Sequence, residues 1–242
     1  MPQDELRFQY PLLALKFPDD ETFASFYPGQ NASLLTQLKN SVVGLGEPVL
    51  YMWGEAGSGR SHLLHALCSE VDERGESVAY IPLDHYQGMS LDIFENMETV
   101  TLVCIDNIDA IAGDEIWEKA LFDFYNRWLD NKSNRLPGAS LVLCASDLPK
   151  LLGIKLDDLV SRFEWGACYH LASLNDEEKL GALQLRAELK GMKLPVDVGR
   201  FLLNRLSRDM DTLLKTLDRL DNASLVAKRK LTIPFVKEVL EL

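Results

Sequence analysis

The sequence predicts an α/β domain built on a five-stranded parallel sheet, followed by a small helical domain. Short apolar runs alternate with helical patterns over the first 171 residues, and runs without polar alternation are typical of strands covered by helices on both faces. The runs are Val49–Trp53, Val78–Ile81, Val100–Ile105, Leu141–Ala145 and Cys168–Leu171. From residue 172 onward the pattern is only helical. We therefore expect an arm at 1–18, an α/β domain at 19–171 and a helical domain at 172–242.

Capping residues mark where the helices begin. Asp114 is the expected N-cap of a helix that continues to about Leu129, and its tryptophans are predicted core residues. An earlier helix follows the Pro28-Gly29 turn and is started by Asn31 or Ser33. The helical domain has four expected start signals: Asn175, Pro195, Asp209 and Thr232.

Composition excludes some classes of function. The chain has 242 residues, of which 47% are apolar and 26% charged, which is typical of a globular protein. Its net charge is −12, and the acids lie mainly before residue 172, where 26 acidic residues face 12 basic ones. Broad, salt-driven binding to bare nucleic acid needs clustered cations, so it is not expected. After residue 172 the count is 13 basic to 11 acidic, which leaves a local basic face open.

Cysteine usage predicts a reducing compartment. The four cysteines lie singly, without a Cys-x-x-Cys pair, and Cys104 and Cys144 fall inside apolar runs, where burial is expected. The N-terminus has acids at Asp4 and Glu5 and does not resemble a signal peptide. No stretch reaches the roughly 18 continuous apolar residues of a membrane span. We expect a cytoplasmic protein that does not associate with membranes.

A glycine-rich segment between the first strand and the next helix carries the clearest chemistry. It has the spacing Gly-x4-Gly-(Lys/Arg)-Ser of a P-loop and comprises Gly54, Glu55, Ala56, Gly57, Ser58, Gly59, Arg60 and Ser61. Glycines let the backbone approach an anion, and the free N–H groups at a helix N-terminus favour negative charge. The alternative, an ordinary glycine-rich turn, does not explain the cation and the hydroxyl at this spacing. We expect nucleotide binding.

The strand that ends at Asp106 supplies a second part of this site. In a P-loop protein this carboxylate holds Mg²⁺, directly or through water, while Ser61 supplies a hydroxyl ligand. The next residue is Asn107, and a carboxamide cannot accept a proton from an attacking water at neutral pH. The guanidinium of Arg60 is also bulkier than the usual lysine ammonium. Both residues predict slow intrinsic hydrolysis.

The N-terminal arm is apolar and interrupted by prolines. So many apolar groups at a terminus need a partner, which is either the chain's own domain or another protein. Gln9-x-x-Leu12-Leu13 resembles the short motif that bacterial proteins insert into the pocket of the replicative sliding clamp. The DNA polymerase III sliding clamp (beta subunit) is therefore a predicted partner, with Gln9, Leu12 and Leu13 as the contact residues.

Long segments resemble the DnaA/Hda group of the AAA+ family. They are Gly57–Ala66, Leu159–Gly166 and Arg208–Leu213, and the order and spacing extend over nearly the whole chain from about residue 19. The resemblance implies an AAA+ base domain with a helical lid that binds ADP or ATP with Mg²⁺. It implies nucleotide contacts at Phe26, Tyr27, Gly54, Gly57, Ser58, Gly59, Arg60, Ser61, His62, Asp106 and Arg208.

The same resemblance assigns further positions. Arg162 corresponds to an arginine finger, a cation supplied to the nucleotide of a neighbouring subunit. Ser146 or Asp147 lies in the sensor 1 region, and the choice between them stays open. His62 and His65 could form a metal pair, but in DnaA-type P-loops this pair belongs to helix packing, which we favour.

Three functions follow from these patterns. The resemblance favours a negative regulator of replication initiation, which docks on the DNA-loaded clamp and stimulates hydrolysis of DnaA-bound ATP through Arg162. The alternatives are a self-contained AAA+ ATPase acting as loader or remodeller, and a small-molecule kinase. The chain ends at Leu242 without the helix-turn-helix domain of DnaA-type initiators, so sequence-specific DNA binding is not expected.

Overall fold

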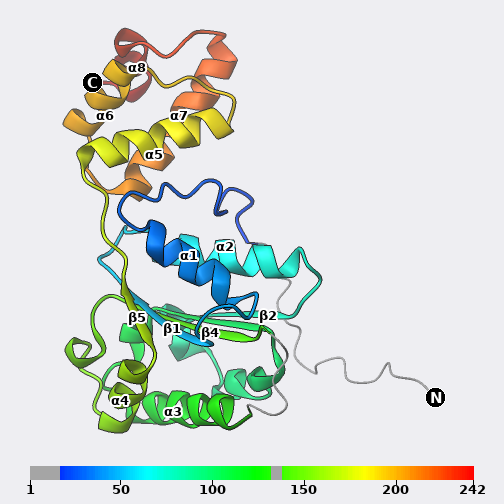
Figure 1. Ribbon diagram of the computed structural model, residues 1–242. Coiled ribbons are helices and arrows are strands. Elements are labelled where there is room, and N and C mark those ends of the chain that lie inside the picture. Colours follow the sequence, from blue (N-terminus) through cyan, green and yellow to red (C-terminus); the bar gives the residue numbers. More distant parts are fainter. Residues whose placement is uncertain (1–16, 132–137) are drawn as a thin grey trace.

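Five parallel strands form the centre of the computed structural model, which describes residues 17–131 and 138–242 (Figure 1). The strands are β1 (Val49–Trp53), β2 (Val78–Pro82), β3 (Leu102–Asp106), β4 (Ser140–Ala145) and β5 (Ala167–His170). They lie in the order β2-β3-β4-β1-β5, and each pairing is parallel. All five apolar runs are strands, so the predicted sheet is confirmed.

Helices cover both faces of this sheet. On one face lie α1 (Ala32–Ser41) and α2 (Arg60–Asp72), and on the other lie α3 (Glu115–Asp130) and α4 (Asp157–Trp165) (Figure 1). Leu38 and Leu64 belong to the core on the first face, and Trp128 and Phe163 to the core on the second. Strands covered on both faces must be apolar on both, which explains their unbroken apolar runs.

Short 3₁₀ helices join these elements. They are η1 (Leu83–Gly88), η2 (Leu91–Phe94), η3 (Met97–Thr99), η4 (Ile108–Ile111) and η6 (Pro149–Leu151).

The helices start where the capping residues predict, but one of these residues does not act as a cap. The Asp114 carboxylate accepts hydrogen bonds from the N–H groups of Ile116 and Trp117, as expected of an N-cap. Helix α1 starts after Asn31, but this side chain caps no N–H group of the helix. It instead exchanges two hydrogen bonds with the backbone of Ala172, of 2.8 and 3.0 Å. Asn31 thereby ties the start of α1 to the segment that follows β5.

The last four helices form a separate group, the lid. They are α5 (Asp176–Leu189), α6 (Val196–Arg205), α7 (Met210–Ala227) and α8 (Ile233–Leu240), and they pack around their own leucine-rich core. Asn175 and Glu178 form a capping box at the start of α5. Figure 1 shows the lid beyond α1 and α2, on their side of the sheet.

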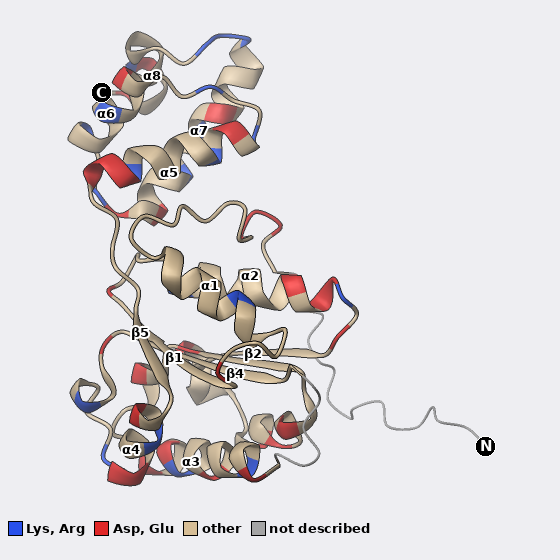
Figure 2. Ribbon diagram, in the orientation of Figure 1, with Lys and Arg blue, Asp and Glu red and all other residues tan. Residues whose placement is uncertain are grey.

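The distribution of charged residues and the burial of two cysteines agree with what the sequence indicates. Figure 2 shows acidic residues spread along the ribbon of the base helices, and lysine and arginine residues in the loop between α7 and α8. Cys104 and Cys144 are fully buried, as predicted, and burial raises the pKa of both thiols. Over residues 17–131 and 138–242, no helix combines the length and apolar character needed to cross a membrane.

Candidate nucleotide-binding site

The glycine-rich turn between β1 and α2 requires its glycines. Gly57 has φ of +76° and Gly59 has φ of +98°, in the left-handed region that side chains disfavour. A Cβ on Gly54 would lie 2.6 Å from the carbonyl oxygen of Leu171, and one on Gly59 would lie 2.7 Å from the ring of Phe26. The turn is therefore compact, and it leads directly into the N-terminus of α2.

Two polar groups of this segment are buried without a hydrogen-bond partner among the described residues. They are the Ser58 hydroxyl and the Nη1 atom of Arg60. A buried donor left unpaired costs about 1–3 kcal/mol, and an anion held at the turn would supply acceptors for both. Together with the free N–H groups of the first turn of α2, these donors fit the phosphates of a nucleotide.

Ser61 and Asp106, the two predicted metal ligands, lie in contact with each other. The Ser61 hydroxyl donates to Oδ2 of Asp106 over 2.6 Å, and Asp106 is fully buried. The hydroxyl of Tyr80 donates to the same oxygen over 2.9 Å, and burial raises the pKa of Tyr80, so it stays a donor. The serine hydroxyl and the carboxylate form an oxygen pair of the kind that Mg²⁺ prefers. Tyr80 was not among the residues predicted for this site.

A further carboxylate, Asp109, lies near Arg60. Asn107 adopts a left-handed conformation with φ of +55°, and η4 follows it and carries Asp109. Oδ1 of Asp109 accepts the N–H of Ser146 over 2.9 Å and lies 3.9 Å from Nη1 of Arg60. Asp109 was not among the predicted site residues, although the Asp-x-x-Asp spacing at the end of a strand was an available signal.

The two candidates in the sensor 1 region, Ser146 and Asp147, differ in their contacts. The Asp147 carboxylate accepts the N–H of the next residue, Leu148, over 2.7 Å, and its carbonyl accepts the hydroxyl of Tyr51 over 2.8 Å. Ser146 is exposed and held by its backbone to Asp109. The carboxylate of Asp147 is therefore used locally, whereas Ser146 is held only through its backbone N–H among the described residues.

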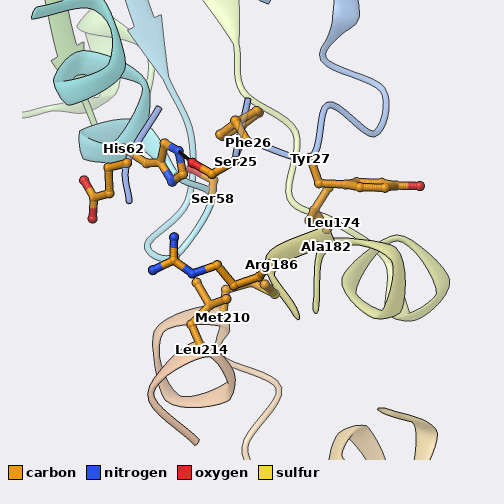
Figure 3. Close-up of a pocket in the computed structure, with 13 residues that line it drawn as sticks. Ser25, Phe26, Tyr27, Ser58, His62, Leu174, Ala182, Arg186, Met210 and Leu214 are labelled. Carbon is orange, nitrogen blue, oxygen red and sulfur yellow. Dashed lines mark hydrogen bonds between the residues drawn. The ribbon is translucent and has the colours of Figure 1, made fainter. Parts of the chain in front are cut away.

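A pocket lies where the glycine-rich turn meets the lid (Figure 3). Its lining includes six of the residues expected to contact nucleotide: Phe26, Tyr27, Gly57, Ser58, Gly59 and His62. The lid side is mainly apolar and is formed by Leu174, Ala182, Met210 and Leu214, with one cation, Arg186. The ring of Tyr27 packs directly on the lid, because a Cβ on Gly181 would lie 2.7 Å from it. An apolar wall next to a phosphate-binding turn is suited to a nucleoside.

The two histidines of α2 hold the segment that precedes α1. Nε2 of His62 lies 2.9 Å from the carbonyl oxygen of Thr22, and burial lowers the pKa of this histidine. Nδ1 of His65 lies 2.5 Å from the Glu21 carboxylate, and this hydrogen bond lowers the pKa of Glu21. Both contacts are with the protein itself, in agreement with the packing interpretation.

Arg208 does not reach this pocket in the structure. Its Nη1 atom lies 3.2 Å from the Asp176 carboxylate, and 63% of its side chain is exposed. The reason is its position before the start of α7, where the first turn of α5 offers an acid. The neighbouring Asp209 instead approaches the turn: a Cβ on Gly57 would lie 3.1 Å from its Oδ1.

Arg162 lies on α4, on the other face of the sheet from the glycine-rich turn and α2 (Figure 1). Its guanidinium lies 4.7 Å from the ring centre of Trp165, which is 76% exposed. In the described part of the chain, no carboxylate forms an ion pair with Arg162. Its backbone is fixed, because the Tyr125 hydroxyl donates to its carbonyl over 3.0 Å.

The predicted clamp-binding residues Gln9, Leu12 and Leu13 lie outside the described residues. Their assignment stays a prediction.

Comparison with known proteins agrees with this architecture. A sequence model of the bacterial DnaA ATPase domain matches residues 18–170, and a model described as the Hda lid domain matches residues 176–240. Domain III of Thermotoga maritima DnaA superposes with a TM-score of 0.75 at 21% identity, covering 93% of this chain and 97% of that one.

Two further structures are similar in fold. AMPPCP-bound DnaA from Aquifex aeolicus has a TM-score of 0.69 at 21% identity, covering 84% of this chain and 66% of that one. The Holliday junction branch migration motor RuvB of Thermotoga maritima has a TM-score of 0.62 at 16% identity, covering 86% and 67%. The DnaA ATPase model spans more than half of this chain and ends where β5 ends, and the Hda lid model begins where α5 begins. The chain therefore belongs to the bacterial DnaA ATPase-domain family of AAA+ proteins and has a lid of the Hda type.

Proposed function

We propose that this protein is a nucleotide-bound negative regulator of replication initiation. It docks on the DNA-loaded sliding clamp through Gln9, Leu12 and Leu13. It then supplies Arg162 to ATP bound on DnaA, and that ATP is hydrolysed. The protein is an activating partner in this scheme, and the chemistry takes place in the other subunit.

The glycine-rich turn supports the nucleotide part of this proposal. The Ser58 hydroxyl and Nη1 of Arg60 are buried at the N-terminus of α2 without a hydrogen-bond partner among the described residues, which suits a diphosphate. Ser61 and Asp106 would hold Mg²⁺ beside it. Bound Mg²⁺ would supply charge neutralisation of the phosphates. We expect ADP as the resident nucleotide, since Asn107 and Arg60 disfavour turnover but leave binding intact.

One observation carries the proposed role in trans. Arg162 is partly exposed, stacks on an exposed tryptophan and has no carboxylate partner within residues 17–131 and 138–242. An arginine that served only local structure would be expected to pair with an acid or to donate to backbone carbonyls. A free guanidinium fixed on a rigid helix is suited to neutralising charge that develops on the phosphoryl group of another subunit.

The test measures hydrolysis of DnaA-bound ATP in the presence of this protein, clamp and DNA. Arg162→Ala is expected to lower the stimulated rate by about 10³–10⁵-fold, the range found for arginine fingers. Lys150→Ala is the matched control, since Lys150 pairs with Glu164 of α4, the helix that carries Arg162. It is expected to change the rate by less than about threefold. Full stimulation by Arg162→Ala would contradict the proposal.

A second variant tests the arm separately. Changing Gln9, Leu12 and Leu13 together to Ala is expected to abolish clamp binding and clamp-dependent stimulation. Nucleotide binding by the isolated protein is expected to stay unchanged. Stimulation equal to wild type by this triple variant would remove the clamp from the scheme.

One observation favours a second function, that of a self-contained ATPase. Asp109 provides a second carboxylate near Arg60 and Ser146. It could take the place of the acid that is missing directly after Asp106, where this chain has Asn107. If Asp109 orients or deprotonates a water, the isolated protein would hydrolyse ATP, and Asp109→Asn would abolish turnover. Steady-state hydrolysis without DnaA separates the two functions: turnover sensitive to Ser61 and Asp109 would support the ATPase.

A further inference from the structure

One arginine lines the pocket between the turn and the lid. Of the residues that line it within the described chain, only Arg186 is a lysine or arginine. Figure 3 shows its side chain extending from α5 past Met210 and Leu214 of α7, toward the part of the base that carries Ser58 and His62. Only 11% of this side chain is exposed, so its charge acts in a largely desolvated place.

The guanidinium is held from one side. Nη1 donates to the carbonyl oxygen of Asp20 over 2.6 Å, and Nη2 forms an ion pair with the Asp20 carboxylate. Nε is buried and has no hydrogen-bond partner among the described residues. A guanidinium has five N–H donors in a fixed plane, so pairing with Asp20 leaves donors free for a ligand. Asp20 thus orients Arg186 without using all of its donors.

A cation at this position would also offset a negative charge that the lid places near the turn. Asp209, the N-cap of α7, approaches Gly57 of the turn, because a Cβ on Gly57 would lie 3.1 Å from its Oδ1. Hydrogen bonds from Thr212 lower the pKa of Asp209. An anion at the turn would therefore meet a negative charge on the lid. Arg208, the lid arginine expected from the sequence, is paired with Asp176 and lies outside the pocket. Arg186 is the lid cation that the geometry brings to the turn.

We infer that Arg186 of α5 is the lid contact of the bound nucleotide and donates to its phosphate oxygens, with Asp20 as the residue that positions it. This inference rests on the proposed nucleotide binding. It transfers the role that the sequence gave to Arg208, which lies between α6 and α7, to a residue 22 positions earlier on α5. It also means that the lid senses nucleotide through the first helix after the base domain.

Isothermal titration of the purified full-length protein with ADP, AMP and adenosine tests the inference. Arg186→Ala is expected to weaken ADP binding by roughly 10- to 100-fold, the effect of losing a hydrogen bond to a charged group. The loss is expected to be smaller for AMP and absent for adenosine, because the contact is to phosphate. Arg200→Ala, which removes a lid arginine paired with Glu177 at the surface, is expected to leave all three affinities unchanged.

Two companion variants separate binding from structure. Asp20→Ala breaks the same ion pair but keeps the guanidinium, so its loss of ADP affinity is expected to be clearly smaller than that of Arg186→Ala. Arg186→Lys keeps the charge without the planar donors and is expected to be intermediate. Thermal melting without nucleotide identifies any variant that fails to fold, and Arg186→Lys then replaces Arg186→Ala in the comparison.

Three outcomes would overturn the inference. They are wild-type ADP affinity in Arg186→Ala, an equal loss in Asp20→Ala, and a loss confined to Arg208→Ala. An equal loss of adenosine affinity would also overturn the phosphate contact. If wild-type protein binds none of the three ligands, the proposed function fails first. If wild type binds ADP and Arg186→Ala binds it equally, only the inference fails.

Discussion

At the scale of single residues, His62 links stability to pH. Burial lowers its pKa below the ordinary value of 6.5, so the folded protein keeps this imidazole neutral where the unfolded chain would protonate it. Unfolding then takes up a proton as pH falls below 6.5, and the free energy of unfolding falls with it. The slope from one such group is at most about 1.4 kcal/mol per pH unit.

Denaturant unfolding between about pH 5.5 and 7.5 tests this prediction. His62→Gln keeps a side-chain donor for the Thr22 carbonyl but cannot titrate, so it is expected to flatten the slope. Glu21, the neighbouring acid, has a pKa lowered below its ordinary value of 4.5, and its contribution is lost only at more acidic pH. An unchanged slope in His62→Gln would show that another group titrates.

Asp209 makes a second prediction at this scale. Its carboxylate approaches the turn, where a Cβ on Gly57 would lie 3.1 Å from Oδ1, and the ionised carboxylate would oppose a bound phosphate. Asp209→Asn keeps a good N-cap for α7 but removes the charge, so nucleotide binding is expected to tighten about two- to tenfold. Titration with ADP at low and high salt checks it. Weaker binding by Asp209→Asn would indicate that the carboxylate assists the ligand.

At the scale of elements, Glu118 fixes the position of α4. This buried carboxylate on α3 accepts the N–H groups of Gly113, Lys155 and Leu156 over 2.6 to 3.1 Å. Lys155 and Leu156 lead directly into α4, which carries Arg162. Glu118 therefore positions the arginine through the backbone, without contacting a ligand.

Replacing Glu118 by Ala leaves three backbone donors without their acceptor. We expect a loss of about 3–5 kcal/mol in the free energy of unfolding, measured by denaturant titration. Glu115→Ala, one turn earlier and 78% exposed, is expected to cost less than about 1 kcal/mol. Equal stability of Glu118→Ala and wild type would show that the loop before α4 is held by other contacts.

The elements themselves were largely predictable, and the contacts between them were not. Buried strands must be apolar, and capping residues act within three positions of a helix start, so both leave a local signal in the sequence. Asp20 and Arg186 are far apart in the chain, as are Glu118 and Leu156, and their meeting depends on how the elements pack. No local pattern distinguishes Arg186 from the other lid arginines. The P-loop was predictable because its chemistry lies within eight consecutive residues.

At the scale of the whole molecule, one polar contact joins the base helices to the connection with the lid. Asn31 is buried and pairs with both backbone groups of Ala172, the second residue after β5. Asn31→Ala leaves these groups unpaired, at a cost of about 2–4 kcal/mol in the free energy of unfolding. Ser33→Ala, exposed on α1, is expected to cost less than about 0.5 kcal/mol.

Removing the Asn31 side chain is also expected to weaken the coupling between base and lid. Hydrogen exchange of the lid on ADP addition should show protection in wild type and less protection in Asn31→Ala. Unchanged stability of Asn31→Ala would mean that water or another group replaces the side chain.

The central claim is that this protein binds its own nucleotide at the glycine-rich turn, while Arg162 acts on ATP bound to DnaA. Two complementary variants test it most directly in the hydrolysis assay with clamp and DNA. Asp106→Asn, which impairs the protein's own metal pair, is expected to keep most of the stimulation at saturating ADP. Arg162→Ala, with its own site intact, is expected to lose it. Loss of stimulation by Asp106→Asn with full stimulation by Arg162→Ala would place the chemistry in this protein's own site and contradict the account.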